Sequence, residues 1–130
     1  MKKSIIISLI LALCLSLSAC GINDCGDIAD YFDDDIYFSK EMTDEEIDTF
    51  IQKREEEGFK LSGEINEIVR INNKNNTDVD PEYAYVIEFD EEADAVDFEE
   101  YVKQNSKIYC KRFEDIVVYG TSVNILKIYD

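Results

Sequence analysis

Residues 59–89 read FKLSGEINEIVRINNKNNTDVDPEYAYVIEF, and they carry the main evidence for the fold class. In the first part of this stretch, apolar residues fall mostly at odd positions with polar residues between them, and Glu67 and Ile68 are exceptions. That alternation predicts a half-buried strand. Residues 73–82 are loop by composition, and residues 83–89 predict a second strand. Because the loop is short, we expect the two strands to pair antiparallel.

A strong helix start precedes this pair of strands. Thr43-Asp44-Glu45-Glu46 is a capping box, in which the Thr43 hydroxyl accepts from the backbone N–H of Glu46 and the Glu46 carboxylate reaches back to Thr43. Gly58 stands where a left-handed residue commonly follows a helix. The sequence therefore predicts a helix over residues 44–57.

Similar signals follow the second strand. Asp90 is a favourable N-cap, and the spacing of apolar residues after it predicts a helix over residues 91–105, with Asn105 just past its end. Residues 107–112 and 116–119 predict two short strands joined as a hairpin.

The tail, residues 123–129, admits two interpretations. Its β-branched residues favour a strand, whereas Val123, Leu126 and Tyr129 fit one face of a helix, which we prefer. The order of predicted elements indicates an α+β class over residues 42–130. We expect a small, mostly antiparallel sheet covered on one face by two or three helices.

Composition excludes some functions. The chain has 130 residues, 13 basic against 30 acidic side chains, a formal charge of −17 and no histidine. This length supports one domain. The acidic balance argues against nucleic-acid binding, which needs Lys and Arg to neutralise phosphates. Without histidine, the commonest general base and the commonest metal ligand are missing.

The N-terminus has the features of an export signal. Lys2 and Lys3 precede an apolar run over residues 5–17, which has the length of a signal-peptide core and is short for a membrane-spanning helix. The run ends in Leu17-Ser18-Ala19-Cys20, which fits the lipobox pattern at all four positions. The N-terminal region therefore resembles a bacterial lipoprotein precursor; the alternative is an ordinary secretory signal with a chance cysteine.

The resemblance implies the processing and the location of the protein. Residues 1–19 would be a signal peptide, cleaved between Ala19 and Cys20, and the Cys20 thiol would carry a diacylglyceryl group. The mature chain would then be held in the bilayer of the cell membrane, on its extracytoplasmic face. It would have 11 basic and 30 acidic residues, a side-chain charge of −19.

The segment after the lipobox predicts a lipid-anchored acidic tether over residues 20–41. We expect it to hold the domain off the bilayer, because anionic headgroups repel so acidic a body. Ile28, Tyr31 and Phe32 are nevertheless too apolar for a purely solvated linker, and they favour a short helix or extended strip docked on the domain.

Two cysteines remain once Cys14 and Cys20 are accounted for. An extracytoplasmic location permits a disulfide between Cys25 and Cys110. The alternative is two unpaired thiols, with Cys110 packed as a small hydrophobic residue. Two thiols without histidine do not make a zinc site.

The loop offers oxygen ligands of the kind that calcium prefers. Asn76, Asp78 and Asp80 have the spacing of the first ligands of an EF-hand loop. The motif fails, however, because Pro81 and Ile87 stand where a glycine and a bidentate glutamate are required.

Other candidate sites carry weak signals. Any pair among the many carboxylates could serve a glycosidase-like hydrolase, and the serines have no histidine to activate them. Lys103, Lys107, Lys111 and Arg112 form the one basic cluster, which is more simply read as complementing a helix C-terminus. Tyrosines on the predicted strands are cross-strand pairs or core, or an exposed face for binding a protein or glycan.

These observations predict a cell-envelope lipoprotein with a small acidic domain. We expect no catalytic residues, no metal site and no cofactor, and the function that remains is binding a protein partner at the membrane surface. The alternatives are a lipoprotein that binds a small ligand or divalent cation, and a small carboxylate-dependent hydrolase.

Overall fold

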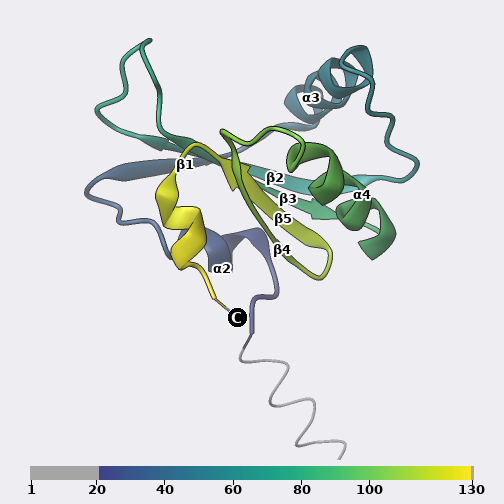
Figure 1. Ribbon diagram of the computed structural model, residues 1–130. Helices are drawn as coiled ribbons and strands as arrows, with labels where there is room; N and C mark the ends of the chain where they lie inside the picture. Colours follow the sequence, from purple (N-terminus) through teal and green to yellow (C-terminus); the bar gives the residue numbers. More distant parts are fainter. Residues whose placement is uncertain (1–20, 130) are drawn as a thin grey trace, which may run out of the picture.

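The computed structural model describes residues 21–129, whose strands form one antiparallel sheet of five strands in the order β1-β2-β3-β5-β4 (Figure 1). The elements are α2 (Cys25–Ala29), β1 (Tyr37–Glu41), α3 (Asp44–Glu56), β2 (Ile65–Asn73), β3 (Tyr83–Phe89), α4 (Glu92–Val102), β4 (Tyr109–Phe113), β5 (Ile116–Gly120) and the 3-10 helix η1 (Val123–Lys127). The predicted α+β class and the antiparallel pairing of the two strands around loop 73–82 are confirmed.

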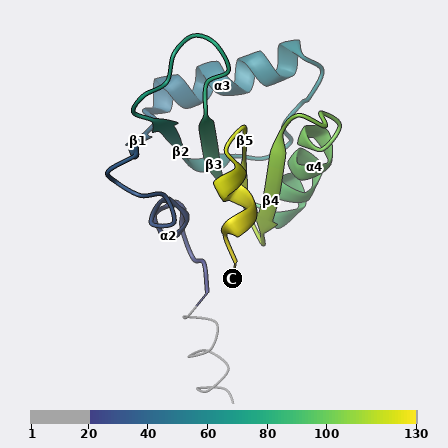
Figure 2. The same ribbon diagram turned by 60° about the vertical axis from the view of Figure 1, so that its left-hand side comes forward.

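Helical elements cover both faces of the sheet, which corrects the expectation of one covered face. α3 and α4 lie on one face, here the α3/α4 face, and α2 and η1 lie on the other, the α2/η1 face (Figures 1 and 2). The central strands explain why. In β3, Ala84 and Val86 enter the core of the α2/η1 face, and Ile87 and Phe89 enter the core of the α3/α4 face. A sheet that is apolar on both sides must be covered on both sides.

A bulge in β2 accounts for the break in its alternation. The register with β3 shifts between Ile65 and Glu67. After the bulge, Ile68 packs on the α3/α4 face, and Val69 and Ile71 pack on the α2/η1 face. The extra residue of a bulge changes which positions point to each face. The two exceptions in the sequence pattern therefore mark a real irregularity of the strand.

The predicted tether is corrected over its described part. Cys25, Ile28, Phe32 and Tyr37 are buried in the core of the α2/η1 face. β1 continues from this segment and pairs with β2 at the sheet edge. The expected docked helix is present as α2, but the segment belongs to the domain, because its apolar side chains supply much of the cover that this face of the sheet requires.

The helix predicted over 44–57 is confirmed. The Thr43 hydroxyl accepts from the Glu46 N–H at 3.2 Å, the Glu46 carboxylate accepts from the Thr43 N–H at 3.2 Å, and Gly58 follows with φ of +102°. The expected Asp90 cap is wrong: the N-cap of α4 is Glu91, which makes no side-chain cap hydrogen bond, and Asp90 still belongs to the sheet through its N–H bond to the Glu64 carbonyl. α4 consequently starts later than predicted.

α4 also ends earlier than expected, and the remaining elements agree with the sequence. The Asn105 carboxamide accepts from the Lys107 N–H, so Asn105 forms a turn beyond the helix. β4 and β5 form the predicted hairpin, with Glu114 at φ of +55° in the connection. The preferred helix in the tail is present as the 3-10 helix η1, with the Ser122 hydroxyl accepting from the Asn124 N–H.

Candidate functional site

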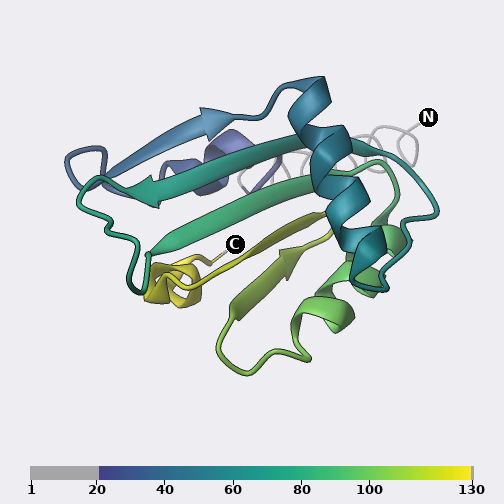
Figure 3. The same ribbon diagram turned by 90° about the horizontal axis from the view of Figure 1, so that it is seen from above.

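The α3/α4 face is only partly covered. α3 crosses β2 and β3 near one end of the sheet, and the opposite ends of these strands extend beyond it (Figure 3). Under the helices, Ile68, Ile87 and Phe89 are buried. Farther along the same strands and on the same face, Asn72 and Tyr83 are only half-buried. The face thus changes from an apolar core to a polar and aromatic surface along the length of two strands.

A groove follows this open surface beside α3. It consists of three hollows of about 650, 360 and 560 Å³, and neighbouring hollows share lining residues. Arg54 lines the first and second, and Met42 and Glu46 line the second and third. We call this continuous feature the α3 groove. It runs from the loop after α4, past α3, to β1 and the loop 73–82.

The α3 groove concentrates positive charge in an acidic protein. Six of the eleven basic residues of the segment 20–130 line it: Lys40, Lys53, Arg54, Arg70, Lys74 and Lys107. Four of the 29 acidic residues within 21–129 line it: Glu45, Glu46, Glu57 and Asp78. Lys40 pairs with Glu46 and Arg54 with Glu57, so six cations against four carboxylates leave an excess of two positive charges, which attracts ligands of the opposite sign. The groove therefore favours an anionic ligand despite the negative charge of the chain.

Arg54 lies at the junction of two of the hollows. Its Nη1 donates to the Tyr119 hydroxyl at 3.4 Å, and its guanidinium lies 4.8 Å from the centroid of the Phe50 ring. Its Nε lies 3.2 Å from a Glu57 oxygen but without the angle of a hydrogen bond, so this buried N–H has no hydrogen-bond partner among the described residues. The guanidinium is thus held in place while one donor remains unused.

Glu57 and the tyrosines complete this end of the groove. The Tyr101 hydroxyl donates to Glu57 at 2.7 Å. Burial raises the pKa of Tyr119 above its ordinary range, and burial with the hydrogen bond to Glu57 raises the pKa of Tyr101. Both phenols therefore stay protonated at neutral pH and present hydroxyls rather than further negative charge.

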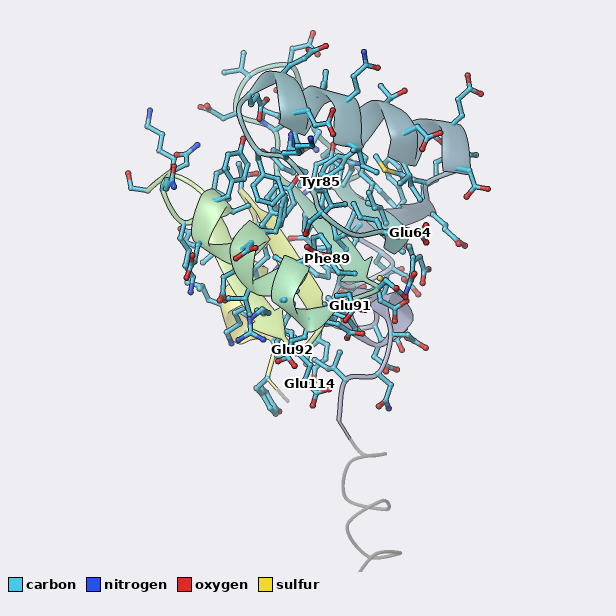
Figure 4. All side chains as sticks on the ribbon, turned by 90° about the vertical axis from the view of Figure 1, so that its right-hand side faces the viewer. Glu64, Tyr85, Phe89, Glu91, Glu92 and Glu114 are labelled. Carbon is cyan, nitrogen blue, oxygen red and sulfur yellow. The ribbon has the colours of Figure 1, made fainter. Side chains whose placement is uncertain are left out.

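A row of cations and aromatic rings crosses the sheet within the groove. Lys40 pairs in register with Arg70, Arg70 with Tyr85, and Tyr85 with Tyr119. The Tyr85 and Tyr119 rings are stacked at 5.5 Å, and the Arg70 guanidinium lies 5.8 Å from the Tyr85 ring. Figure 4 shows Tyr85 beside α3, with Glu91, Glu92 and Glu114 toward the opposite end of the sheet. Aromatic faces and guanidinium groups together suit recognition of a peptide or of a planar anionic group such as a carboxylate.

The loop 73–82 uses its oxygen atoms internally. Glu82 accepts from the Tyr37 and Ser122 hydroxyls at 2.7 Å each and from the Asn73 amide at 2.9 Å. Burial alone would raise the pKa of Glu82, but these hydrogen bonds lower it overall. Asn76 bonds to the Glu82 backbone. Among residues 21–129, no group of three or more His, Cys, Asp or Glu side chains is placed to hold a metal ion.

The possible disulfide is not formed. Cys25 and Cys110 are both free thiols, and they lie on opposite faces of the sheet. Cys25, the first residue of α2, is fully buried, and burial raises the pKa of its thiol above the ordinary range. Burial raises the pKa of the Cys110 thiol to about 11. The alternative of unpaired thiols, with Cys110 packed beside a hydrophobic core, describes the structure.

The predicted basic cluster is divided. Arg112 pairs with Glu92 and Glu99, Lys103 pairs with Glu99, and Lys111 donates to backbone carbonyls of the C-terminal segment. Lys107 alone lines the α3 groove. The other five groove cations could not be predicted from the sequence, because they come from β1, α3, β2 and the loop 73–82, and no spacing in the chain marks them as neighbours.

The tyrosine prediction is resolved by position. Tyr83, Tyr85 and Tyr119 share the α3/α4 face as cross-strand neighbours. Tyr83, Tyr101 and Tyr119 line the largest hollow, and Glu57 is the only carboxylate among the described residues that line it.

The predicted lipidation site Cys20 and the predicted cleavage point between Ala19 and Cys20 lie outside the described residues. Over residues 21–129, none of the helices combines the length and the apolar character that a membrane crossing requires. No family model, no curated protein and no solved structure matches this chain.

Proposed function

We propose that this protein is a membrane-anchored lipoprotein of the cell envelope, whose acidic, non-catalytic domain binds a protein partner through the α3 groove. The anchor is the diacylglyceryl group expected on Cys20. The lipobox Leu17-Ser18-Ala19-Cys20 supports this part. The observation that carries the binding part is the concentration of six cations and three stacked or adjacent tyrosine rings in one groove of a strongly acidic chain.

The chemistry of the groove suggests the kind of partner segment. Lys53 and Arg70 are exposed and have the reach to pair with carboxylates, and the half-buried Tyr85 ring lies beside Arg70. The rest of the domain is strongly negative and repels a long polyanion, because repulsion acts over roughly 8–10 Å at physiological salt. A short acidic segment of a protein fits these two conditions better than nucleic acid or an extended anionic polymer.

The test is crosslinking in intact cells, followed by mass spectrometry of what co-purifies from the membrane fraction. A Lys53→Glu, Arg70→Glu double variant reverses two charges in the groove. Lys60→Glu with Lys127→Glu makes the same charge change at exposed sites outside it. Equal melting temperatures for the two double variants would establish that both domains are folded.

We expect one dominant envelope protein to co-purify with the wild-type chain and with the control. We expect this protein to be lost with the groove variant. Cys20→Ser, which removes the anchor, should also lose it from the membrane fraction. Recovery of the same protein with the groove variant would contradict the assigned face. Recovery of background proteins alone in every sample would contradict the proposal that the domain binds a protein partner. Small anionic ligands would then be tested in the same groove by calorimetry.

A further inference from the structure

An exposed apolar patch lies on the α2/η1 face, away from the α3 groove. It comprises Tyr31, Val123, Leu126 and Tyr129, with relative exposures between 43% and 73%. We propose that this patch rests on the lipid bilayer and so turns the α3 groove outward. The proposal rests on the lipid anchor of the proposed function, and it adds a second membrane contact made by the domain itself.

The patch is built from two pairs of side chains. Residues three apart in a 3-10 helix lie one above the other, so Val123 and Leu126 present one side of η1. The Tyr31 and Tyr129 rings meet edge to face at 6.1 Å, and the Tyr31 hydroxyl donates to the Tyr129 carbonyl at 2.8 Å. The segment after α2 and the C-terminal tail are thereby joined beside η1.

The anchor leaves the domain on the same side. Ile22 packs against the core cluster that contains Ile125 and Ile128, the buried residues of the C-terminal segment. The first described residues and the C-terminal end lie next to each other in both views (Figures 1 and 2). Cys20 is two residues before Ile22, so the backbone between them spans at most about 7 Å. A lipid on Cys20 therefore holds this side of the domain at the membrane.

The length of this connection selects the bilayer as the occupant. The anchor keeps lipid beside the patch at high local concentration. A partner protein or a second copy of this chain would have to displace that lipid. Tyrosine and leucine side chains suit the interfacial region, where an amphipathic ring lies at headgroup level. Asp27 and Asp30 of the neighbouring segment disfavour anionic headgroups, so the contact should be strongest on zwitterionic lipid.

The experiment uses the absence of tryptophan from the chain. Tyr129→Trp places a single emitter in the patch, and Leu126→Trp gives a second reporter if the first variant folds poorly. Phe38→Trp is the matched control, because Phe38 is also about half exposed but lines the groove on the opposite face. Each full-length lipoprotein is purified from membranes and reconstituted in phosphatidylcholine vesicles with and without brominated acyl chains.

The expected result is quenching of the patch tryptophan by brominated lipid. Its emission should fall about twofold relative to the Phe38→Trp control, because an interfacial tryptophan lies within reach of the upper acyl chain.

Flotation with the vesicles tests the anchor separately. Flotation without preferential quenching would overturn the bilayer contact and leave the anchor intact. A spectral shift that depends on protein density, observed in place of quenching, would assign the patch to contacts between copies of the chain. That result would also overturn the bilayer contact. Failure to float, with no diacylglyceryl mass on Cys20, would contradict the proposed function itself.

Discussion

The two faces of the sheet are closed in different ways. The α2/η1 face is covered by segments from the two ends of the described chain, and its core includes Ile28 from one and Ile125 from the other. The α3/α4 face is covered by α3 and α4, and these helices leave part of the face uncovered, where Asn72 and Tyr83 are half-buried. Incomplete cover of this second face leaves the α3 groove, the surface that we propose for binding.

The faces also differ in their electrostatics. On the α2/η1 face, Glu67 and Glu88 are register partners, and burial followed by neighbouring carboxylates raises the pKa of each. The folded domain thus holds these protons more tightly than the unfolded chain does. The protonated Glu67 and Glu88 therefore stabilise the folded domain at low pH. This stabilisation is lost as the pH rises through their raised pKa values. The opposite face instead gathers cations in the α3 groove.

The largest effect is expected from the cover of the α2/η1 face. Ile28→Ala removes a fully buried side chain, and we expect a loss of about 2–5 kcal/mol in the free energy of unfolding. Ile36→Ala makes the same truncation at an exposed site of the same segment and should change the free energy little. Urea denaturation of both variants measures the difference. An equally small effect for Ile28→Ala would return the segment to the status of a tether.

The capping boxes at the starts of α2 and α3 compare the two faces directly. Thr43→Ala should cost about 1 kcal/mol, because it leaves the Glu46 N–H without its acceptor. Asp24→Ala should cost less, because the Asp24 charge also raises the pKa values of Glu67 and Glu88, and its removal relieves that repulsion. Urea denaturation at neutral pH distinguishes the two, and equal losses would contradict the electrostatic difference between the faces.

A smaller effect of opposite sign is expected at the carboxylate pair. Glu88→Gln should raise the free energy of unfolding at pH 7 by about 0.5 kcal/mol, since like charges directly opposite on neighbouring strands repel. The gain should shrink near pH 4, below the ordinary glutamate pKa of about 4.3. Glu100→Gln, on the exposed side of α4, is the control with the same charge change. Thermal melts across this pH range provide the measurement, and a gain that persists at low pH would point to packing instead.

The smallest effect is expected from calcium. Millimolar calcium should leave the melting temperature unchanged, because Asn73 and Asn76 already bond to Glu82 in the loop. Asp78→Asn should behave like the wild-type chain in the same assay. A rise in melting temperature that this variant abolishes would instead support the divalent-cation alternative.

Much of the local structure could be predicted because its causes lie within a few residues. The Thr43 box and Gly58 define α3 through backbone hydrogen bonds and a left-handed turn. The hairpin of β4 and β5 followed from two apolar runs and a short connection. One local feature was not predicted correctly. Asp90 has the chemistry of a cap, but it belongs to the sheet, because its N–H bonds to the carbonyl of Glu64 just before β2.

The amino-acid sequence by itself determined the α+β class, the antiparallel pairing around loop 73–82 and the lipobox that predicts an anchor, because periodicity, capping and motif spacing are properties of neighbouring residues. Only the tertiary structure decided the strand order, the two covered faces, the separation of Cys25 from Cys110 and the α3 groove. Contacts such as that between Tyr31 and Tyr129, 98 residues apart, depend on how the whole sheet is assembled. The groove has the same origin, since its cations become neighbours only when β1, α3 and β2 meet.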